Sequence, residues 1–112
     1  MHGLSIDTDL AFLVGRNLQA IAGDDYQMRL VFDEGVEITL ECDCEIDGTR
    51  TPLPAQAQAL SPFVGCSIRS HEHGGDGSVR LVFDRLGELT LLDANKEFES
   101  YNISWKGGTI VV

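Results

Sequence analysis

Two histidines and nearby carboxylates form the stretch of this sequence that looks most like a metal site. His71 and His73 lie two residues apart in "HEHGGDG", so both imidazoles leave the same side of a β-strand. Asp76 or Glu72 could add an oxygen ligand, and His2 could join only through the tertiary fold. Zinc requires three or four converging ligands. We therefore favour a polar strand end that runs into a glycine turn, with the metal site as a speculative alternative.

The cysteines offer a second candidate chemistry. Cys42 and Cys44 are separated by one residue, which on a strand directs both thiols to one side. Redox-active pairs have two residues between the cysteines, at the start of a helix, so this spacing predicts structural buried thiols. A zinc site that combines them with the histidines is the alternative. Cys66 makes the number odd, and the start of the chain shows no signal peptide, so we expect a reduced, cytoplasmic protein.

Catalysis finds little support in the remaining motifs. The carboxylate pairs at 24–25 and at Glu97 and Glu99 accompany a high acid content and stand in no recognisable catalytic context. The chain has no serine–histidine–aspartate signature, P-loop or dinucleotide-binding motif. The sequence therefore predicts a protein without enzymatic activity, and we assign no catalytic residue and no cofactor.

The charge is the most unusual property of the composition. Eighteen acidic against eight basic residues give a formal net charge of −10 over 112 residues. Such a surface repels phosphates and anionic lipids, which argues against nucleic acid and membranes as partners. It attracts a basic protein, although acidity that serves only solubility is the competing explanation. Five carboxylates on outward strand faces could form one negative stripe that docks such a partner: Glu37, Glu41, Asp43, Glu45 and Glu88.

A repeated pentapeptide shows how the chain is organised. "RLVFD" occurs at 29–33 and again at 80–84. Before the two copies come "LAFLVGRNL" and "LSPFVGCSI", in the same order and at nearly the same distance. We infer a single domain over 1–112 that contains an internal duplication, with repeats at about 10–41 and 60–92.

Each repeat has the pattern of a β-hairpin. In the first repeat, apolar residues alternate with polar ones over 28–32 and 36–40. A three-residue loop at 33–35 sets Phe32 against Val36, apolar against apolar. It also places a glycine at the third loop position, where a left-handed residue is needed. The sequence therefore predicts a three-residue turn.

The second hairpin should differ at its tip, and each hairpin should gain one more strand. The glycine of the second loop stands one position later, at Gly87, so we expect a longer or bulged turn. The segments at 16–23 and 66–73 predict a strand before each hairpin, followed by the turns "GDD" and "GGDG". Each half is therefore expected to be a three-stranded meander.

The repeated arginines fall on the polar face of these hairpins. The register of the first hairpin places Arg29 opposite Thr39, with Glu37 and Glu41 as diagonal neighbours. Arg80 repeats this position. We expect a structural salt bridge.

The segments outside the hairpins are predicted from glycine and proline. Residues 47–54 should form a loop, and "PAQAQAL" at 54–60 a short helix with proline in its first turn. "DTDLAFL" near the start should be a helical turn capped by Asp7 or Thr8.

The C-terminal segment 98–112 has no counterpart in the first half of the chain and is predicted to form another hairpin. A Gly-Gly turn at 107–108 would pair Trp105 with Ile110, and Trp105 should contribute the largest buried area. Phe98 is out of phase with this face, which implies a bend just after it. With about eight strands, two pseudo-twofold-related meanders and one or two helical turns, we expect an all-β sandwich or barrel.

The repeated motifs are similar to those of a group of small uncharacterised bacterial two-repeat all-β proteins. The similarity rests on "VG" at 14–15 and 64–65, "FD" at 32–33 and 83–84, and "ESYNI" at 99–103. Some similar small acidic proteins are thought to be immunity proteins that neutralise toxins delivered between bacteria. The resemblance implies protein binding rather than catalysis, and it transfers no active-site residue.

The sequence is therefore compatible with three functions. The first is a non-catalytic protein-binding module, such as a bacterial immunity protein whose acidic face neutralises a basic toxin. The second is a structural or regulatory homodimer that pairs strand edges or a shared apolar face. The third is a small-ligand or metal-binding domain that uses His71 and His73.

Overall fold

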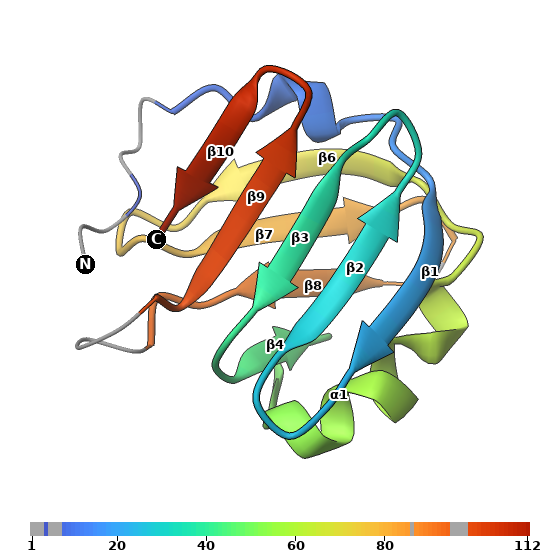
Figure 1. Cartoon of the computed structure of the whole chain (residues 1–112), viewed down its shortest axis with the longest axis vertical. Helices are drawn as coiled ribbons and strands as arrows, with labels where there is room; N and C mark the ends of the chain where they lie inside the picture. The colour runs from blue at the N-terminus through green and yellow to red at the C-terminus, as the bar shows by residue number, and fades with distance from the viewer. Residues whose placement is uncertain (1–3, 5–7, 86, 95–98) are drawn as a thin grey trace.

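The protein is a sandwich of two β-sheets (Figure 1). The computed structural model describes residues 4, 8–85, 87–94 and 99–112. Within them, ten strands form two five-stranded antiparallel sheets, accompanied by one short α-helix. The prediction of an all-β fold is confirmed. Of its two alternatives the sandwich is correct, because neither sheet closes into a barrel.

Both sheets have the same construction. The first has the order β1–β2–β3–β9–β10: β1 (Leu18–Gly23), β2 (Met28–Phe32), β3 (Glu37–Leu40), β9 (Tyr101–Trp105) and β10 (Gly108–Val111). The second has the order β5–β4–β8–β7–β6: β4 (Cys44–Ile46), β5 (Thr49–Thr51), β6 (Ile68–His73), β7 (Val79–Phe83) and β8 (Glu88–Leu91). The helical elements are the 3-10 helices η1 (Ala11–Leu13) and η2 (Ser61–Phe63) and the α-helix α1 (Leu53–Leu60).

The two halves of the chain exchange strands between the sheets. β1–β3 and β6–β8 form the two predicted meanders, one in each sheet. β4 follows β3 in the chain but pairs with β8, whereas β9 follows β8 but pairs with β3. The prediction that the C-terminal hairpin has no counterpart is therefore wrong. The β4–β5 hairpin occupies the equivalent place in the second sheet, although its sequence differs.

The first hairpin has the predicted register. Leu30 lies opposite Ile38, and the Phe32 N–H donates to the Val36 carbonyl at 2.8 Å. Gly35 adopts a left-handed conformation with φ +76°, as the three-residue turn requires. Alternation of apolar residues excludes a two-residue loop, which would set Phe32 against Glu37, and Gly35 favours the three-residue turn.

The second hairpin is not longer than the first, so that prediction is wrong. The Phe83 N–H donates to the Gly87 carbonyl at 2.9 Å, and Val82 lies opposite Glu88, which repeats the register of the first hairpin. Gly87 is a glycine for a different reason. A Cβ at this position would collide with the Asp47 carboxylate, whose Oδ1 accepts the Glu88 N–H at 2.9 Å.

The segment between the halves contains more structure than expected. α1 is confirmed, and η2 continues it directly. The predicted loop at 47–54 is wrong, because Asp47 (φ 52°) and Gly48 (φ 82°) form a tight turn between β4 and β5. Asp-Gly favours such turns because both residues tolerate positive φ.

The N-terminal helical turn is present as η1, but the predicted cap is wrong, because the N-cap residue is Leu10 and it makes no side-chain hydrogen bond. The Asp9 carboxylate accepts the Ala11 N–H at 2.9 Å, whereas the Thr8 carbonyl contacts His73. Asp7 lies outside the described residues. Leu10 and Leu13 are completely buried, so this turn closes one side of the core.

The C-terminal hairpin has a different register from the predicted one. Trp105 pairs with Gly108 and Ile103 with Ile110, so the turn consists of Lys106 and Gly107. The shift by two residues keeps the apolar face unchanged. Trp105 is only partly buried and stacks on Phe12, with ring centroids 4.4 Å apart.

The core is filled by matching positions of the two meanders. Tyr101, rather than Trp105, is the largest fully buried side chain. Leu30 and Leu81 occupy equivalent places on β2 and β7, and both are fully buried. The bend predicted after Phe98 concerns a residue outside the described ones. Among the described residues, no helix is long and apolar enough to cross a membrane.

Candidate functional site

The exchange of strands brings two connecting segments together. The chain leaves β3 at Glu41, and it enters β9 through Ser100, whose carbonyl accepts the Glu41 N–H at 2.9 Å. Titratable groups from both segments meet at this point. We call the following residues the crossover site: Glu41, Cys42, Asp43, Asp93, Glu99 and Ser100.

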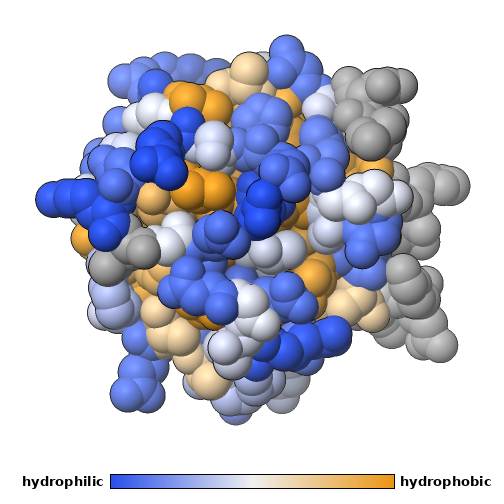
Figure 2. Space-filling view, turned by 180° about the vertical axis from the view of Figure 1, so that it is seen from behind, coloured by the Kyte–Doolittle hydropathy of each residue, from blue (hydrophilic) through white to orange (hydrophobic). Residues whose placement is uncertain are grey.

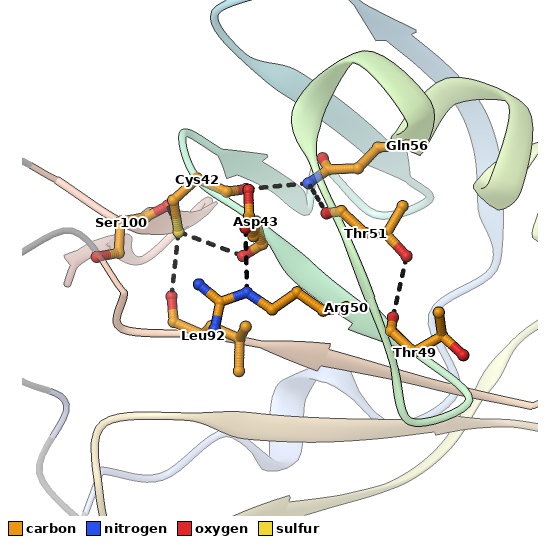
Figure 3. Close-up of polar contacts among 8 residues, drawn as sticks. All are labelled: Cys42, Asp43, Thr49, Arg50, Thr51, Gln56, Leu92 and Ser100. Atoms are coloured by element: carbon orange, nitrogen blue, oxygen red, sulfur yellow. Dashed lines mark hydrogen bonds and ion pairs between the residues drawn. The ribbon is translucent and has the colours of Figure 1, made fainter.

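Cys42 lies at the centre of the crossover site (Figure 3). Its thiol is 3.4 Å from the carbonyl oxygens of Asp43 and Leu92 and 3.5 Å from that of Ser100. The Cys42 carbonyl accepts a hydrogen bond from Gln56 Nε2 at 2.9 Å, and the same nitrogen lies 3.2 Å from the Thr51 carbonyl. Because Gln56 is completely buried, this contact fixes α1 against the crossover site.

The two neighbouring thiols are held in the protonated form. Burial raises the pKa of Cys42, and burial raises the pKa of Cys44 to about 12. All three cysteines are free, and Cys44 and Cys66 are buried. The predicted structural role is therefore favoured at Cys44. Cys42 precedes β4, so the expectation that both thiols lie on one strand is wrong.

Two carboxyl groups of the crossover site share a hydrogen bond. Burial raises the pKa of Glu41, and the hydrogen bond and charge of the Glu99 side chain raise it further. Glu41 Oε2 is buried and has no hydrogen-bond partner. Two carboxylates cannot approach in this way at neutral pH without mutual repulsion.

Glu41→Gln is therefore expected to stabilise the protein at pH 7. Because the folded pKa of Glu41 lies above the unfolded one, its contribution to stability is lost as the pH rises from about 4.5 upward. Glutamine removes this loss, and we expect a gain of roughly 0.5 kcal/mol or less, since solvent screens the pair. Urea unfolding at pH 4 and pH 7 checks this. An equal effect at both pH values would contradict the carboxyl interaction.

A turn of the second sheet packs against the same site. The Ser100 hydroxyl donates to Asp93 Oδ1 at 3.1 Å, and the Tyr101 hydroxyl donates to the Gly77 carbonyl at 2.7 Å. A Cβ at Gly77 would lie 2.7 Å from Asp93 Oδ2, so the turn must contain glycine to pack this closely. Burial, followed by the Asp93 charge, raises the pKa of Tyr101.

The acidic residues predicted to form one stripe are divided among three places, so that prediction is wrong. Glu37 lies on the outer face of the first sheet, and Glu45 and Glu88 lie on the outer face of the second. Glu41 and Asp43 belong to the crossover site. The division follows from the exchange of strands, because β4 leaves the sheet that contains β3.

Arginines already neutralise part of this set. Arg29 binds Glu37 with Nη2 and Oε1 2.6 Å apart, which confirms the predicted diagonal salt bridge to this residue. Arg50 binds Asp43 at 3.0 Å. Arg80 lies 3.8 Å from Glu88.

The structure brings the two histidines together without Asp76. His71 and His73 lie on the inward side of β6, with ring centroids 6.1 Å apart, and His73 Nε2 is 2.9 Å from the Thr8 carbonyl. Asp76 Oδ1 accepts the Ser78 N–H at 3.1 Å within its own turn. In the part of the chain that the structure describes, no three His, Cys, Asp or Glu side chains are grouped as a metal site requires. His2 lies outside that part.

The aspartate of each "FD" motif makes hydrogen bonds that were not predicted from the sequence. We call these contacts of Asp33 and Asp84 the polar joint. Asp33 and Asn17 exchange two hydrogen bonds: the Asp33 N–H donates to the Asn17 carbonyl, and the Asn17 N–H donates to Asp33 Oδ1, both at 3.0 Å. Asp84 and Ser67 repeat the arrangement at 2.9 and 3.1 Å. A β-bridge between Asn17 and Ser67 joins the two copies. The "FD" repeat was the signal for this joint.

Comparison with known proteins found no match to a family model, a curated protein or a solved structure.

Proposed function

We propose that this protein is a non-catalytic binding module for a basic protein. The proposal is supported by how its charges are arranged. Five arginines already contact carboxylates of the same chain: Arg16 with Asp33, Arg29 with Glu37, Arg50 with Asp43, Arg80 with Glu72, and Arg85 with Asp84. These contacts leave a net charge of −10 for the surroundings of the protein.

This charge acts on a partner over a longer range than any single contact. At physiological salt an electrostatic field extends about 8 Å, enough to steer an oppositely charged protein before it docks. From the side of the second sheet, hydrophilic residues cover most of the surface, and apolar residues show between them (Figure 2). Glu45 and Glu88 lie on the outer face of this sheet. The proposed partner therefore carries a basic surface, and Glu45 and Glu88 are the carboxylates of the second sheet that it would contact.

The resemblance to bacterial immunity proteins suggests the class of partner. An immunity protein has to bind its toxin quickly, and complementary charge raises the association rate more than it raises the affinity. A basic toxin would have the charge that is complementary to this protein and would therefore associate with it quickly. No residue of this chain is required to act chemically in that role.

Binding of a basic partner should weaken with salt and with loss of charge from the second sheet. The protein is used to capture partners from a lysate of its source organism at low salt, and a captured basic protein is then purified. We expect its association rate to fall about tenfold or more between low and high salt. The double substitution Glu45→Gln with Glu88→Gln should lower the rate at low salt, because both charges lie on the outer face of the second sheet.

The matched control is Thr109→Gln, an uncharged exposed position on β10 of the first sheet. It should leave the association rate unchanged. The proposal fails if no basic protein binds at low salt, or if the rate does not respond to salt.

A further inference from the structure

The free edges of the two sheets differ in their protection against strand pairing. Within the described residues, β1 and β10 are the edges of the first sheet and β5 and β6 those of the second. β6 carries Arg69 and Glu72, and β5 has three residues with Arg50 at its centre. β10 has four residues and β1, "LQAIAG", has six, and neither strand contains a charge or a proline, so β1 is the longer unprotected edge. Edges of soluble proteins are ordinarily blocked by such residues.

The backbone of β1 presents hydrogen-bonding groups at this edge. The Asp24 N–H donates to the Gln27 carbonyl at 3.0 Å, at the end of the ladder between β1 and β2. Bonded pairs alternate along an antiparallel ladder, so Ala22 and Ala20 also bond to β2. The N–H and C=O groups of Ile21 and Gly23 therefore point away from the sheet, whereas those of Leu18 are already bonded to Cys66 and Gly65, so the open part of the edge begins after Leu18. In Figure 1 no strand lies on that side of β1.

We propose that two copies of this chain pair through β1, antiparallel and about a twofold axis, so that the first sheets of both copies form one continuous sheet. With Ile21 opposite the Ile21 of the second copy, Ala20 lies opposite Ala22. Both alanines are exposed on the outer face, and their small side chains leave the two backbones free to approach.

The charges around β1 favour this arrangement over a parallel one. Arg16, which also contacts Asp33 at 3.6 Å, precedes β1, whereas Asp24 and Asp25 follow it. Antiparallel pairing brings the acidic turn of each copy towards the end of β1 that carries Arg16 in the other. Tyr26, which is 81% exposed, lies in the same turn and adds apolar surface to the contact. The strand is thus complementary to itself in charge as well as in backbone.

This pairing is independent of the proposed binding of a basic partner, and salt distinguishes the two. Each copy carries a net charge of −10, so the copies repel each other at low salt. Salt screens that repulsion and should strengthen the dimer, whereas it should weaken binding of a basic protein. Either proposal can therefore fail without the other.

Sedimentation velocity of the purified full chain, at about 1 to 100 µM and at low and high salt, tests the pairing. We expect a dimer at the upper concentrations that is favoured by salt. The double substitution Ala20→Lys with Ala22→Lys should weaken it at least tenfold, because lysines then lie opposite each other across the pair. Lysine is common on edge strands, so the variant should fold, and circular dichroism confirms this.

The control carries lysines at the equivalent positions of β6, Ser70→Lys with Glu72→Lys. Ser70 lies opposite Val82 as Ala20 lies opposite Val31, and Glu72 opposite Arg80 as Ala22 opposite Arg29. This variant should dimerise like the unmodified protein. A strict monomer at every concentration and salt would overturn the proposal, and so would equal weakening by both variants.

Discussion

Tyr101→Ala should lower the free energy of unfolding by about 3–5 kcal/mol, the range for truncation of a large buried ring. Tyr101 is 0% exposed and the largest fully buried side chain. It begins β9 at the point where this strand joins the sheet of the other half, opposite Leu40. Urea unfolding at pH 7 measures the loss.

Tyr101→Phe distinguishes the contribution of the ring to stability from that of its hydroxyl. It keeps the packing but leaves the Gly77 carbonyl without its 2.7 Å donor, so we expect a loss of about 1–3 kcal/mol. The pKa of Tyr101 is raised in the folded state, so the unfolded tyrosine ionises first and stability falls as the pH rises above about 10. Phenylalanine should reduce this alkaline loss. Equal losses for both variants at pH 7 would show that packing of the ring is not decisive.

Asp33→Ala and Asp84→Ala should each cost about 1–3 kcal/mol of stability. Each substitution removes a carboxylate that accepts a backbone N–H, from Asn17 in the first repeat and Ser67 in the second. The Asp33 substitution should cost more, because Asp33 is less exposed than Asp84 and lies closer to its arginine, 3.6 Å from Arg16 against 3.9 Å between Asp84 and Arg85. Thermal and urea unfolding of the single variants check the order.

The double variant tests whether the two copies of the joint act together. Asn17 and Ser67 form a β-bridge with each other, so loosening one side should weaken the other. We expect the double variant to deviate from the sum of the single losses by at least about 0.5 kcal/mol. Asp25→Ala, in an exposed turn, is the control and should change stability little. Strict additivity would contradict a shared joint.

Alternation along a strand predicted the faces and the local pairs of this fold. The pairing of Leu30 with Ile38 and the bridge from Arg29 to Glu37 followed from loop length and parity alone. Both partners lie within ten residues of each other, where the chain leaves few other arrangements. Local geometry therefore sufficed for the meanders.

Pairing between distant strands was not predictable in the same way. The alternation of apolar residues predicts that Ile103 faces the core. It does not predict that Ile103 pairs with Ile38 on the adjacent strand rather than with a residue of the second repeat. In the C-terminal hairpin, turns at 106–107 and at 107–108 can both keep apolar residues together. The structure selects the former, and a Cβ at Gly107 would lie 2.5 Å from Trp105 Nε1.

The candidate site was predicted least well, for the same reason. Glu41 and Asp43 were recognised as acidic neighbours in the sequence, but their contacts with Glu99 and Arg50 depend on where other segments pass. The histidine pair on β6 was predicted from spacing alone. No feature of the sequence indicated that Gln56 is buried, because glutamine side chains are ordinarily exposed.

The exchange of β4 and β9 also constrains how the molecule reaches its fold. Each sheet needs a strand from the other half, so neither repeat can complete its own sheet. The pairing of β3 with β9 joins residues more than sixty positions apart, and contacts of such high contact order slow folding. A single repeat would present a hairpin without a sheet to receive it. Two single-repeat chains could complete their sheets by domain swapping, in which each chain gives a strand to the sheet of the other. The present chain makes the same exchange between its own two halves.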